Sequence, residues 1–458
     1  MKNYDIAVVG ASTAGSYFAR RMAEKGFSVL LIDKDSREKL SPSYDIFHMS
    51  RDEMKQFGLP EVKEGDGIYE FTFEESAICS VYGNHPKPST LAVVGMHKHG
   101  YCVLMNDWAV EAGAEIEYEA SFKKLTYNEN GKINGLIYEK NGEEIAVSCR
   151  LVADCSGIPA VVRRSLPDDY GIEKFELKPD DIFYVILRYI DFEEKTEERY
   201  LRSDFWLYFK SWLAPSGRNS DALIGIGACG GFDVAEKVYA LFEKTAVLPA
   251  HKVTKVEKGI TPYHRAPYSF VSDGFIAMGD AACLTKPNCG EGCTSALVLT
   301  DIAVDVATQV MANGAYPTRE ALWSINKRYN STQGKEFASL MALLGSIVRH
   351  SAKANEYLFR KDVIFSCKLL SGMGNGIQLD FADYAKTLIF VVVGLVTGKI
   401  KSAELKSVIK AIVTSGKLTA HYEKYPETPE GYEAWAKEAE LLWAKTDKVA
   451  SWDSVKNF

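Results

Sequence analysis

The sequence of 458 residues has no long apolar run, no block of basic residues and no paired cysteines. Its longest strongly apolar stretch, Leu388–Val396, is far shorter than the roughly 18 residues that a membrane span needs. The net charge of −7, without a basic cluster, argues against nucleic acid as a main partner. The nine cysteines lack the paired spacing of a secreted disulfide scaffold, which favours a reducing compartment.

The first residues run directly into a strand pattern and leave no room for a signal peptide. We therefore expect a cytoplasmic protein, and a peripheral contact with a membrane stays open. The eight histidines show no metal-ligand spacing, so no metal site is expected. Hydrophobic residues at 47% and charged residues at 25% are typical of a folded protein with a large core.

Residues 4–33 have the order strand, glycine-rich turn, helix, strand and acid that is typical of a dinucleotide-binding unit. Strands are expected over Tyr4–Val9 and Phe27–Ile32, with a helix over Ser16–Lys25 between them. The helix N-terminus offers N–H groups and a positive dipole end to phosphates, and Asp33 can accept hydrogen bonds from a ribose. The contacts expected in this unit are Gly10, Ser12, Ala14, Gly15, Asp33 and Lys34.

Two later segments each place a carboxylate at the end of an apolar strand. One is Leu151–Gly157 and the other is Phe275–Ala282. Carboxyl ends of parallel strands meet at the ligand edge of a sheet, where an acid can hold a ribityl hydroxyl. A loop over residues 287–292 then leads into a long apolar helix that ends near Gly314. The expected contacts here are Asp154, Gly157, Gly279, Asp280, Gly290 and Gly292.

These three segments resemble the fingerprints of the glutathione-reductase-type FAD proteins, in the subgroup that includes p-hydroxybenzoate hydroxylase. Within that subgroup the chain is most similar to the geranylgeranyl reductase family. Glu291 stands between the loop glycines, where the hydroxylases more often carry glutamine. Residues 212–215, Trp-Leu-Ala-Pro, followed by Gly225-Ile226-Gly227, are similar to the substrate-lid motif Tyr-x-Trp-x-Phe-Pro…Gly-x-Gly of that family. Lys210 and Ala214 depart from it, since they replace the tyrosine and the phenylalanine.

The resemblance implies an α/β fold with a discontinuous Rossmann-type FAD-binding domain, an antiparallel-sheet substrate domain and a C-terminal helical region. The ranges are 1–55, 96–165 and 265–330 for FAD binding, 56–95 and 166–264 for the substrate domain, and 331–458 for the helices.

It also implies a FAD-dependent oxidoreductase of lipid metabolism, which passes a hydride from reduced flavin to a carbon–carbon double bond of an apolar, isoprenoid-like substrate. A FAD-dependent monooxygenase acting on an aromatic or apolar substrate shares the fingerprints and stays open as the alternative. Neither the electron donor, NAD(P)H or a ferredoxin-like protein, nor the proton donor is identified. The implied substrate contacts are Tyr208, Trp212, Pro215, Gly225 and Gly227.

In this subgroup a basic residue precedes the second helix of the FAD domain. Counting fifteen residues back from Gly113 reaches Lys98, ahead of a helix expected over Asn106–Ala112. Two interpretations stay open, a contact with the pyrophosphate or flavin and a solvated surface lysine.

Aromatic and β-branched runs predict the antiparallel sheet, at Tyr69–Phe73, Ala77–Tyr82, Ile182–Leu187 and Phe205–Phe209. The aromatic cluster at residues 205–212 is either core or the wall of a substrate pocket. The tail is helical in pattern, most clearly after Thr428. A buried helix is expected at Leu388–Val396, with a membrane-dipping helix as the alternative.

Cys283, Cys289 and Cys293 are expected close to the cofactor. Their spacing differs from Cys-x-x-Cys, which favours small residues filling a turn over a redox pair. Structural roles are expected for Tyr263 and His264.

Overall fold

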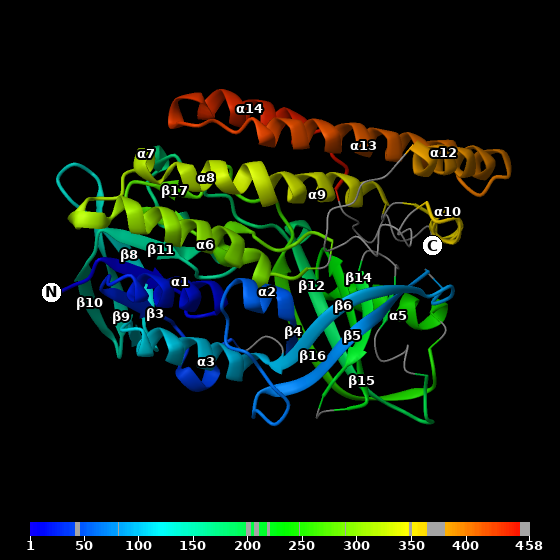
Figure 1. Ribbon diagram of the computed structural model, residues 1–458, viewed down its shortest axis with the longest axis horizontal. Helices are drawn as coiled ribbons and strands as arrows, with labels where there is room; N and C mark the ends of the chain where they lie inside the picture. Colours follow the sequence, from blue (N-terminus) through cyan, green and yellow to red (C-terminus); the bar gives the residue numbers. More distant parts are fainter. Residues whose placement is uncertain are drawn as a thin grey trace.

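The computed structural model has three β-sheets with helices packed on and between them (Figure 1). A largely parallel sheet occupies one half of the molecule and a larger mixed sheet the other, and C-terminal helices run along one long edge (Figure 1). This is the predicted α/β class with a C-terminal helical region. The described residues are 1–41, 46–80, 82–197, 203–205, 210–217, 220–246, 248–288, 290–347, 350–363 and 381–448.

The largely parallel sheet has the strand order β17-β18-β11-β2-β3-β7. Its strands are β2 (Ile6–Val9), β3 (Val29–Ile32), β7 (Glu115–Glu117), β11 (Leu151–Asp154), β17 (Val271–Ser272) and β18 (Phe275–Ala277). β11 pairs in parallel with β2 and with β18, and Asp154 lies opposite Val9 on one side and Ala277 on the other. The three segments singled out in the sequence therefore end at the same edge of one sheet.

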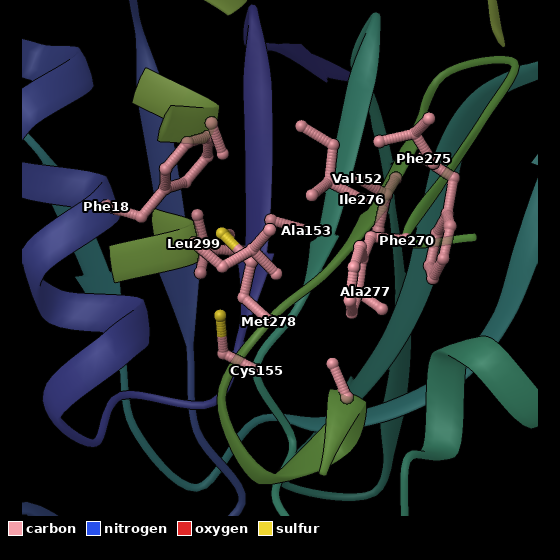
Figure 2. Close-up of a cluster of buried hydrophobic side chains, with 14 of the residues drawn as sticks. Phe18, Val152, Ala153, Cys155, Phe270, Phe275, Ile276, Ala277, Met278 and Leu299 are labelled. Atoms are coloured by element: carbon pink, nitrogen blue, oxygen red, sulfur yellow. The ribbon is translucent and has the colours of Figure 1, made fainter. Parts of the chain in front are cut away.

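Apolar side chains from this sheet and two long helices form the largest core of the chain. The helices are α1 (Thr13–Glu24) and α6 (Cys293–Val310). Phe18 of α1 and Leu299 of α6 point toward Ala153 and Met278 of the sheet segments (Figure 2). All four side chains are fully buried, so this core holds the helix N-termini and the strand ends in place.

A smaller sheet of four strands flanks this core, in the order β1-β10-β9-β8. Its strands are β1 (Lys2–Asn3), β8 (Ser121–Tyr127), β9 (Ile133–Lys140) and β10 (Glu143–Ser148).

The mixed sheet has eight strands in the order β16-β12-β15-β14-β13-β5-β6-β4. They are β4 (Ile46–Ser50), β5 (Tyr69–Cys79), β6 (Lys87–His97), β12 (Ile182–Phe192), β13 (Ser203–Phe205), β14 (Lys210–Pro215), β15 (Ala222–Cys229) and β16 (His251–Pro262). The pairing is antiparallel except between β13 and β5, which run parallel, so the prediction of a purely antiparallel sheet is wrong at that pair.

Two strands predicted at Tyr69–Phe73 and Ala77–Tyr82 form the single strand β5. Irregularities in its pairing with β6 lie between Tyr69 and Phe71 and between Phe73 and Glu75. Each one shifts the alternation of side chains, which is why the pattern breaks although the strand continues.

Helices connect and cover the sheets, and α6 is the longest of them before the C-terminal layer. The others are α2 (Arg51–Gln56), α3 (Lys98–Glu111), α4 (Val161–Ser165), α5 (Phe232–Thr245), α7 (Arg319–Leu322), α8 (Ser324–Tyr329), α9 (Lys335–Ile347), α10 (Ala352–Arg360), α12 (Phe381–Val396), α13 (Ser402–Glu423) and α14 (Tyr432–Trp443). Among the described residues, α6 is also the one helix that could cross a membrane by length and composition. Just over half of it, 56%, is buried inside the protein, as in a core helix.

The helix predicted at Asn106–Ala112 starts earlier, at Lys98. The His97 side chain caps it by accepting a hydrogen bond from the backbone N–H of Gly100, 3.2 Å away. Histidine is not among the residues preferred at a helix N-cap, so the sequence does not indicate that α3 begins at Lys98.

The C-terminal layer consists of α13 and α14, which pack on each other, and α13 also packs on α9 (Figure 1). The helix expected after Thr428 is α14, and its residues Tyr432, Trp435, Ala439 and Leu442 are buried. The indole of Trp435 stacks on the His421 ring at 4.7 Å and donates a hydrogen bond to the His421 carbonyl oxygen.

The prediction of a buried helix at Leu388–Val396 is wrong. The segment forms the end of α12, but most of its large apolar side chains are exposed. α12 meets α10 along one narrow stripe, where Gly394 lies against Tyr357 and the Tyr357 hydroxyl donates to the Phe390 carbonyl oxygen at 2.8 Å. A helix that is apolar all round cannot bury itself through one stripe of contact.

Candidate functional site

The glycine-rich turn after β2 leaves no space for a side chain at either of its two glycines. Gly10 has a φ of +106°, and an added Cβ would overlap the carbonyl oxygen of Cys155 at the end of β11. A Cβ on Gly15 would overlap the carbonyl oxygen of Gly10. The turn, α1 and β11 are therefore packed backbone to backbone, which only glycine permits.

The N-terminus of α1 opens at this turn. Ser12 is its N-cap, but the Ser12 side chain makes no capping hydrogen bond to the helix. Its hydroxyl lies 3.2 Å from that of Ser41 instead. The first N–H groups of α1 are thus left for an acceptor from outside the helix.

Asp33 at the end of β3 faces the same turn. It accepts hydrogen bonds from the backbone N–H groups of Ala11 at 2.7 Å and Asp35 at 2.9 Å. Burial raises its pKa, against the lowering effect of these two bonds. Lys34, also expected to contact the cofactor, is exposed, and its ammonium lies 3.0 Å from the Asp35 carboxylate.

Asp154 is fully buried, and both of its carboxylate oxygens are used inside the protein. Oδ1 accepts from the Ser156 hydroxyl at 2.6 Å, and Oδ2 accepts from the Arg163 N–H at 2.7 Å. These bonds hold the turn that contains Gly157, whose φ is +75°. Asp154 therefore stabilises the backbone of this turn, and a direct hydrogen bond from Asp154 to the cofactor stays a prediction.

Asp280 lies where the third fingerprint meets the first. The preceding residue, Gly279, lies against Ala14 of α1. Asp280 Oδ1 is 3.3 Å from the Thr285 hydroxyl and 3.4 Å from where a Cβ of Gly292 would stand. Gly292 is the N-cap of α6, so this carboxylate sits between the N-termini of two helices.

Lys98 faces Asp280 across the site. Burial raises the pKa of Asp280, and the charge of Lys98 acts to lower it. The charge of Lys98 also acts to lower the pKa values of the Cys102 and Cys293 thiols, which burial raises. Of the two interpretations of Lys98, its place among these groups favours a cofactor contact over a solvated surface lysine.

These groups fit FAD. A tight turn with two glycines and a helix N-terminus without a side-chain cap suits a pyrophosphate, and Asp33 at a strand end suits a ribose. Asp280, held near Lys98 between two helix N-termini, suits the ribityl chain and adjacent phosphate. The three fingerprints converge because β2, β11 and β18 are neighbours in one sheet.

A cluster of ionisable side chains surrounds the loop that carries Glu291. His48 of β4 places its Nε2 atom 3.5 Å from Oε1 of Glu291. Burial acts to raise the pKa of Glu291, but His48, Lys286 and Lys210 lower it to about 2. Lys210 Nζ lies against Gly290, 2.9 Å from where a Cβ would stand.

A second carboxylate, Glu53 of α2, lies beside this cluster. It accepts a hydrogen bond from the Thr294 hydroxyl at 3.0 Å. Burial and the charge of Glu291 raise its pKa. Two neighbouring carboxylates with opposite pKa shifts are the arrangement expected where protons are held and passed on.

The lid segment packs tightly on β15. The Trp212 ring covers Gly225, since a Cβ there would overlap the indole, and Lys210 Nζ lies 4.8 Å from the ring centre. Trp212 is only partly buried, so part of this residue stays accessible to solvent. Pro215 pairs with Ala222 and Gly227 with Lys210 in the same two strands. Tyr208, also predicted to contact substrate, lies outside the described residues, as do Trp206 and Phe209.

The cysteines near the site are not activated. Burial raises the pKa values of Cys283 and Cys293 to about 12, so both stay protonated thiols at neutral pH. Cys289 lies outside the described residues. His264 stacks on Phe175 at 4.4 Å and Tyr263 packs on Phe183 at the same distance, in agreement with structural roles.

The comparisons with known proteins agree with this geometry. The FAD binding domain family matches residues 3–209. The digeranylgeranylglycerophospholipid reductase of Sulfolobus acidocaldarius is 24% identical, and the alignment covers 98% of this chain and 99% of that protein. The chain is a FAD-dependent oxidoreductase that resembles the geranylgeranyl reductases. Reductase 1 of the same type from Methanopyrus kandleri is 26% identical over 73% of this oxidoreductase and 87% of its own length.

Solved structures show that this oxidoreductase shares its fold with flavoproteins of several kinds. A geranylgeranyl bacteriochlorophyll reductase-like protein from Thermoplasma acidophilum aligns with a TM-score of 0.64 at 16% identity, over 96% of this chain and all of that one. A flavin-dependent brominase aligns with a TM-score of 0.59 at 16% identity, over 85% and 94% of the two chains.

Sequence analysis missed His48 and Glu53 of the oxidoreductase. His48 is a single histidine on a short strand, and Glu53 is one of two acids on a short helix. Of the three residues, only Glu291 is singled out by the sequence, through its place between two glycines. His48 and Glu53 are neighbours in sequence, on β4 and α2, but only the fold brings them to Glu291, which lies more than two hundred residues later.

Proposed function

We propose that this oxidoreductase reduces carbon–carbon double bonds of an isoprenoid lipid. The observation that carries the proposal is the full-length match to a digeranylgeranylglycerophospholipid reductase, which spans 98% of this chain rather than the FAD domain alone. The alignment therefore extends over the mixed sheet and the C-terminal helices, and not only over the cofactor fold.

The residues around Glu291 suit this chemistry. When bound, reduced FAD supplies a hydride to one carbon of the double bond, and the other carbon needs a proton. Nε2 of His48 delivers that proton, and the neighbouring carboxylate of Glu291, whose pKa is lowered to about 2, orients the imidazole ring. Glu53, with its raised pKa, is placed to return a proton to the pair. The Trp212 face and the buried sheet behind it exclude water from the reacting atoms.

The rival function is a FAD-dependent monooxygenase. Aklavinone-11 hydroxylase aligns with a TM-score of 0.56 at 15% identity, a likeness of fold. An anaerobic experiment separates the two: the purified protein is reduced with dithionite and mixed with a polyprenyl lipid. Reoxidation of the flavin with loss of a double bond supports the reductase. Oxygen uptake driven by NADPH with an aromatic substrate, and no anaerobic reoxidation, would support the monooxygenase.

Trp212→Ala is expected to raise KM for the apolar substrate by roughly ten- to a hundredfold, because apolar contact with an aromatic ring is worth about 1.5–3 kcal/mol. Steady-state kinetics with a polyprenyl lipid measure the change, and FAD content should stay at the wild-type value. Trp108→Ala is the control, since that partly buried indole lies on α3 against Arg20. A small polar best substrate, with Trp212→Ala equal to wild type, contradicts this role.

The same proposal includes a cytoplasmic location with contact to a membrane, where an isoprenoid lipid resides. The electron donor is a reduced nicotinamide or a ferredoxin-like protein. Stopped-flow measurement of the rate at which each candidate reduces the bound flavin distinguishes the two.

A further inference from the structure

One face of α12 exposes a dense set of large aliphatic side chains. The exposed fractions are 65% for Leu388, 59% for Ile389 and 83% for Val396, and Val392 and Val393 are also exposed. A monomeric soluble protein rarely leaves so many neighbouring aliphatic side chains in water, since the transfer cost grows with the apolar area.

The next helix also exposes large aliphatic side chains. Residues 397–401 join α12 to α13, on which Ile409, Ile412 and Val413 are exposed. The spacing of three and four residues places these three side chains on one face of α13. The opposite face, with Ala411, Thr414 and Leu418, is buried. Both helices belong to the outermost layer of the molecule (Figure 1).

Lysines surround these side chains. Between residues 386 and 422 the sequence has six lysines and one acid, whereas the whole chain has a net charge of −7. The acid, Glu404, turns inward and accepts hydrogen bonds from the Ser351 N–H at 2.9 Å and hydroxyl at 2.8 Å. Lys399, Lys406 and Lys417 are exposed, with no ion pair to any residue that the structure describes.

We propose that the exposed faces of α12 and α13, called here the α12–α13 face, dock onto a bilayer that contains anionic lipids. The aliphatic side chains enter the interface, and the lysines contact the headgroups, extending along their stems past the apolar surface. The inference rests on the proposed function only in that a lipid substrate gives the docking a use.

Charge favours a bilayer over a second copy of this chain. Two copies that met through this face would bring both sets of lysines together without acids to pair with them. An anionic lipid surface supplies the complementary charge along the whole face.

Flotation of the FAD-loaded protein with vesicles tests the proposal. Vesicles of phosphatidylcholine with phosphatidylglycerol should carry the protein upward at low salt, and vesicles of phosphatidylcholine alone should carry much less. The double variant Leu388→Ser/Val396→Ser should lower the partition coefficient by about tenfold or more. Lys406→Glu/Lys417→Glu should lower it by a similar factor, and added salt should weaken binding of the wild-type protein.

Val253→Ser/Val256→Ser is the matched control, because both valines are exposed on β16, away from this face, and should leave flotation unchanged. FAD content and melting temperature confirm that each variant is folded. No flotation, flotation unaffected by the α12 changes, or a dimer in sedimentation that the same changes abolish would each overturn the proposal. Because flotation uses no substrate, failure of the alkene assay leaves this result standing, and failure of flotation leaves the proposed reaction standing.

Discussion

His48→Asn is expected to slow reduction of the double bond by roughly a hundred- to ten-thousandfold, the usual contribution of a positioned general acid. Asparagine keeps a polar side chain of similar reach, but it cannot deliver a proton. FAD content and reduction of the flavin by dithionite should be unchanged, since neither needs a proton from this side chain. The anaerobic rate of flavin reoxidation by a polyprenyl lipid measures the effect.

His85→Asn is a matched control, because His85 also lies near a glutamate, with its Nε2 3.7 Å from Glu356, but away from the cofactor site. Glu291→Gln should give a smaller loss, about tenfold, because it removes the carboxylate charge that lies 3.5 Å from Nε2 of His48. A His48→Asn protein that reoxidises at the wild-type rate would remove His48 from the mechanism.

Asp280→Ala is expected to weaken FAD binding by roughly ten- to a hundredfold. Hydrogen bonds from the ribityl chain to a carboxylate are worth about 1.5–3 kcal/mol, which corresponds to that range. Asp280→Asn should lie between the variant and the wild-type protein, because it keeps the shape and loses the charge. FAD fluorescence released after extensive dialysis and denaturation gives the retained fraction.

The control for Asp280 is Asp305→Ala, on the exposed side of α6, where the carboxylate pairs with Arg328. It should retain FAD as the wild-type protein does. Undiminished FAD in Asp280→Ala would show that the ribityl chain is held by other groups, and the role of the third fingerprint would need a new assignment.

The cofactor site could be predicted in large part because each of its segments is local. Gly10 to Asp33 form one strand–helix–strand unit, and the turn geometry depends on residues that are close in sequence. The segments that carry Asp154, at the end of β11, and Asp280, in the turn after β18, are predictable for the same reason. The sequence does not distinguish the roles of the two aspartates. Both carboxylate oxygens of Asp154 accept hydrogen bonds from its own turn, whereas the charge of Lys98 acts to lower the pKa of Asp280.

The sequence-based predictions of β5 and α3 were wrong for physical reasons. Pairing irregularities broke the alternation along β5, so one strand looked like two. An unusual histidine cap concealed the start of α3. In each case the deciding contact comes from a partner strand or a side chain whose position is not encoded in periodicity.

The sequence by itself determined the cofactor fold and the chemistry class, because glycine turns, strand ends and helix starts follow from steric rules over short distances. Only the tertiary structure decided which side chains meet there, His48 with Glu291 and Trp212 with Gly225, since those contacts join separate elements. It also decided that the apolar run at Leu388–Val396 faces outward. A helical segment of nine apolar residues has no polar face, so its sequence does not indicate which side is buried. Only the neighbouring elements that pack against it determine this.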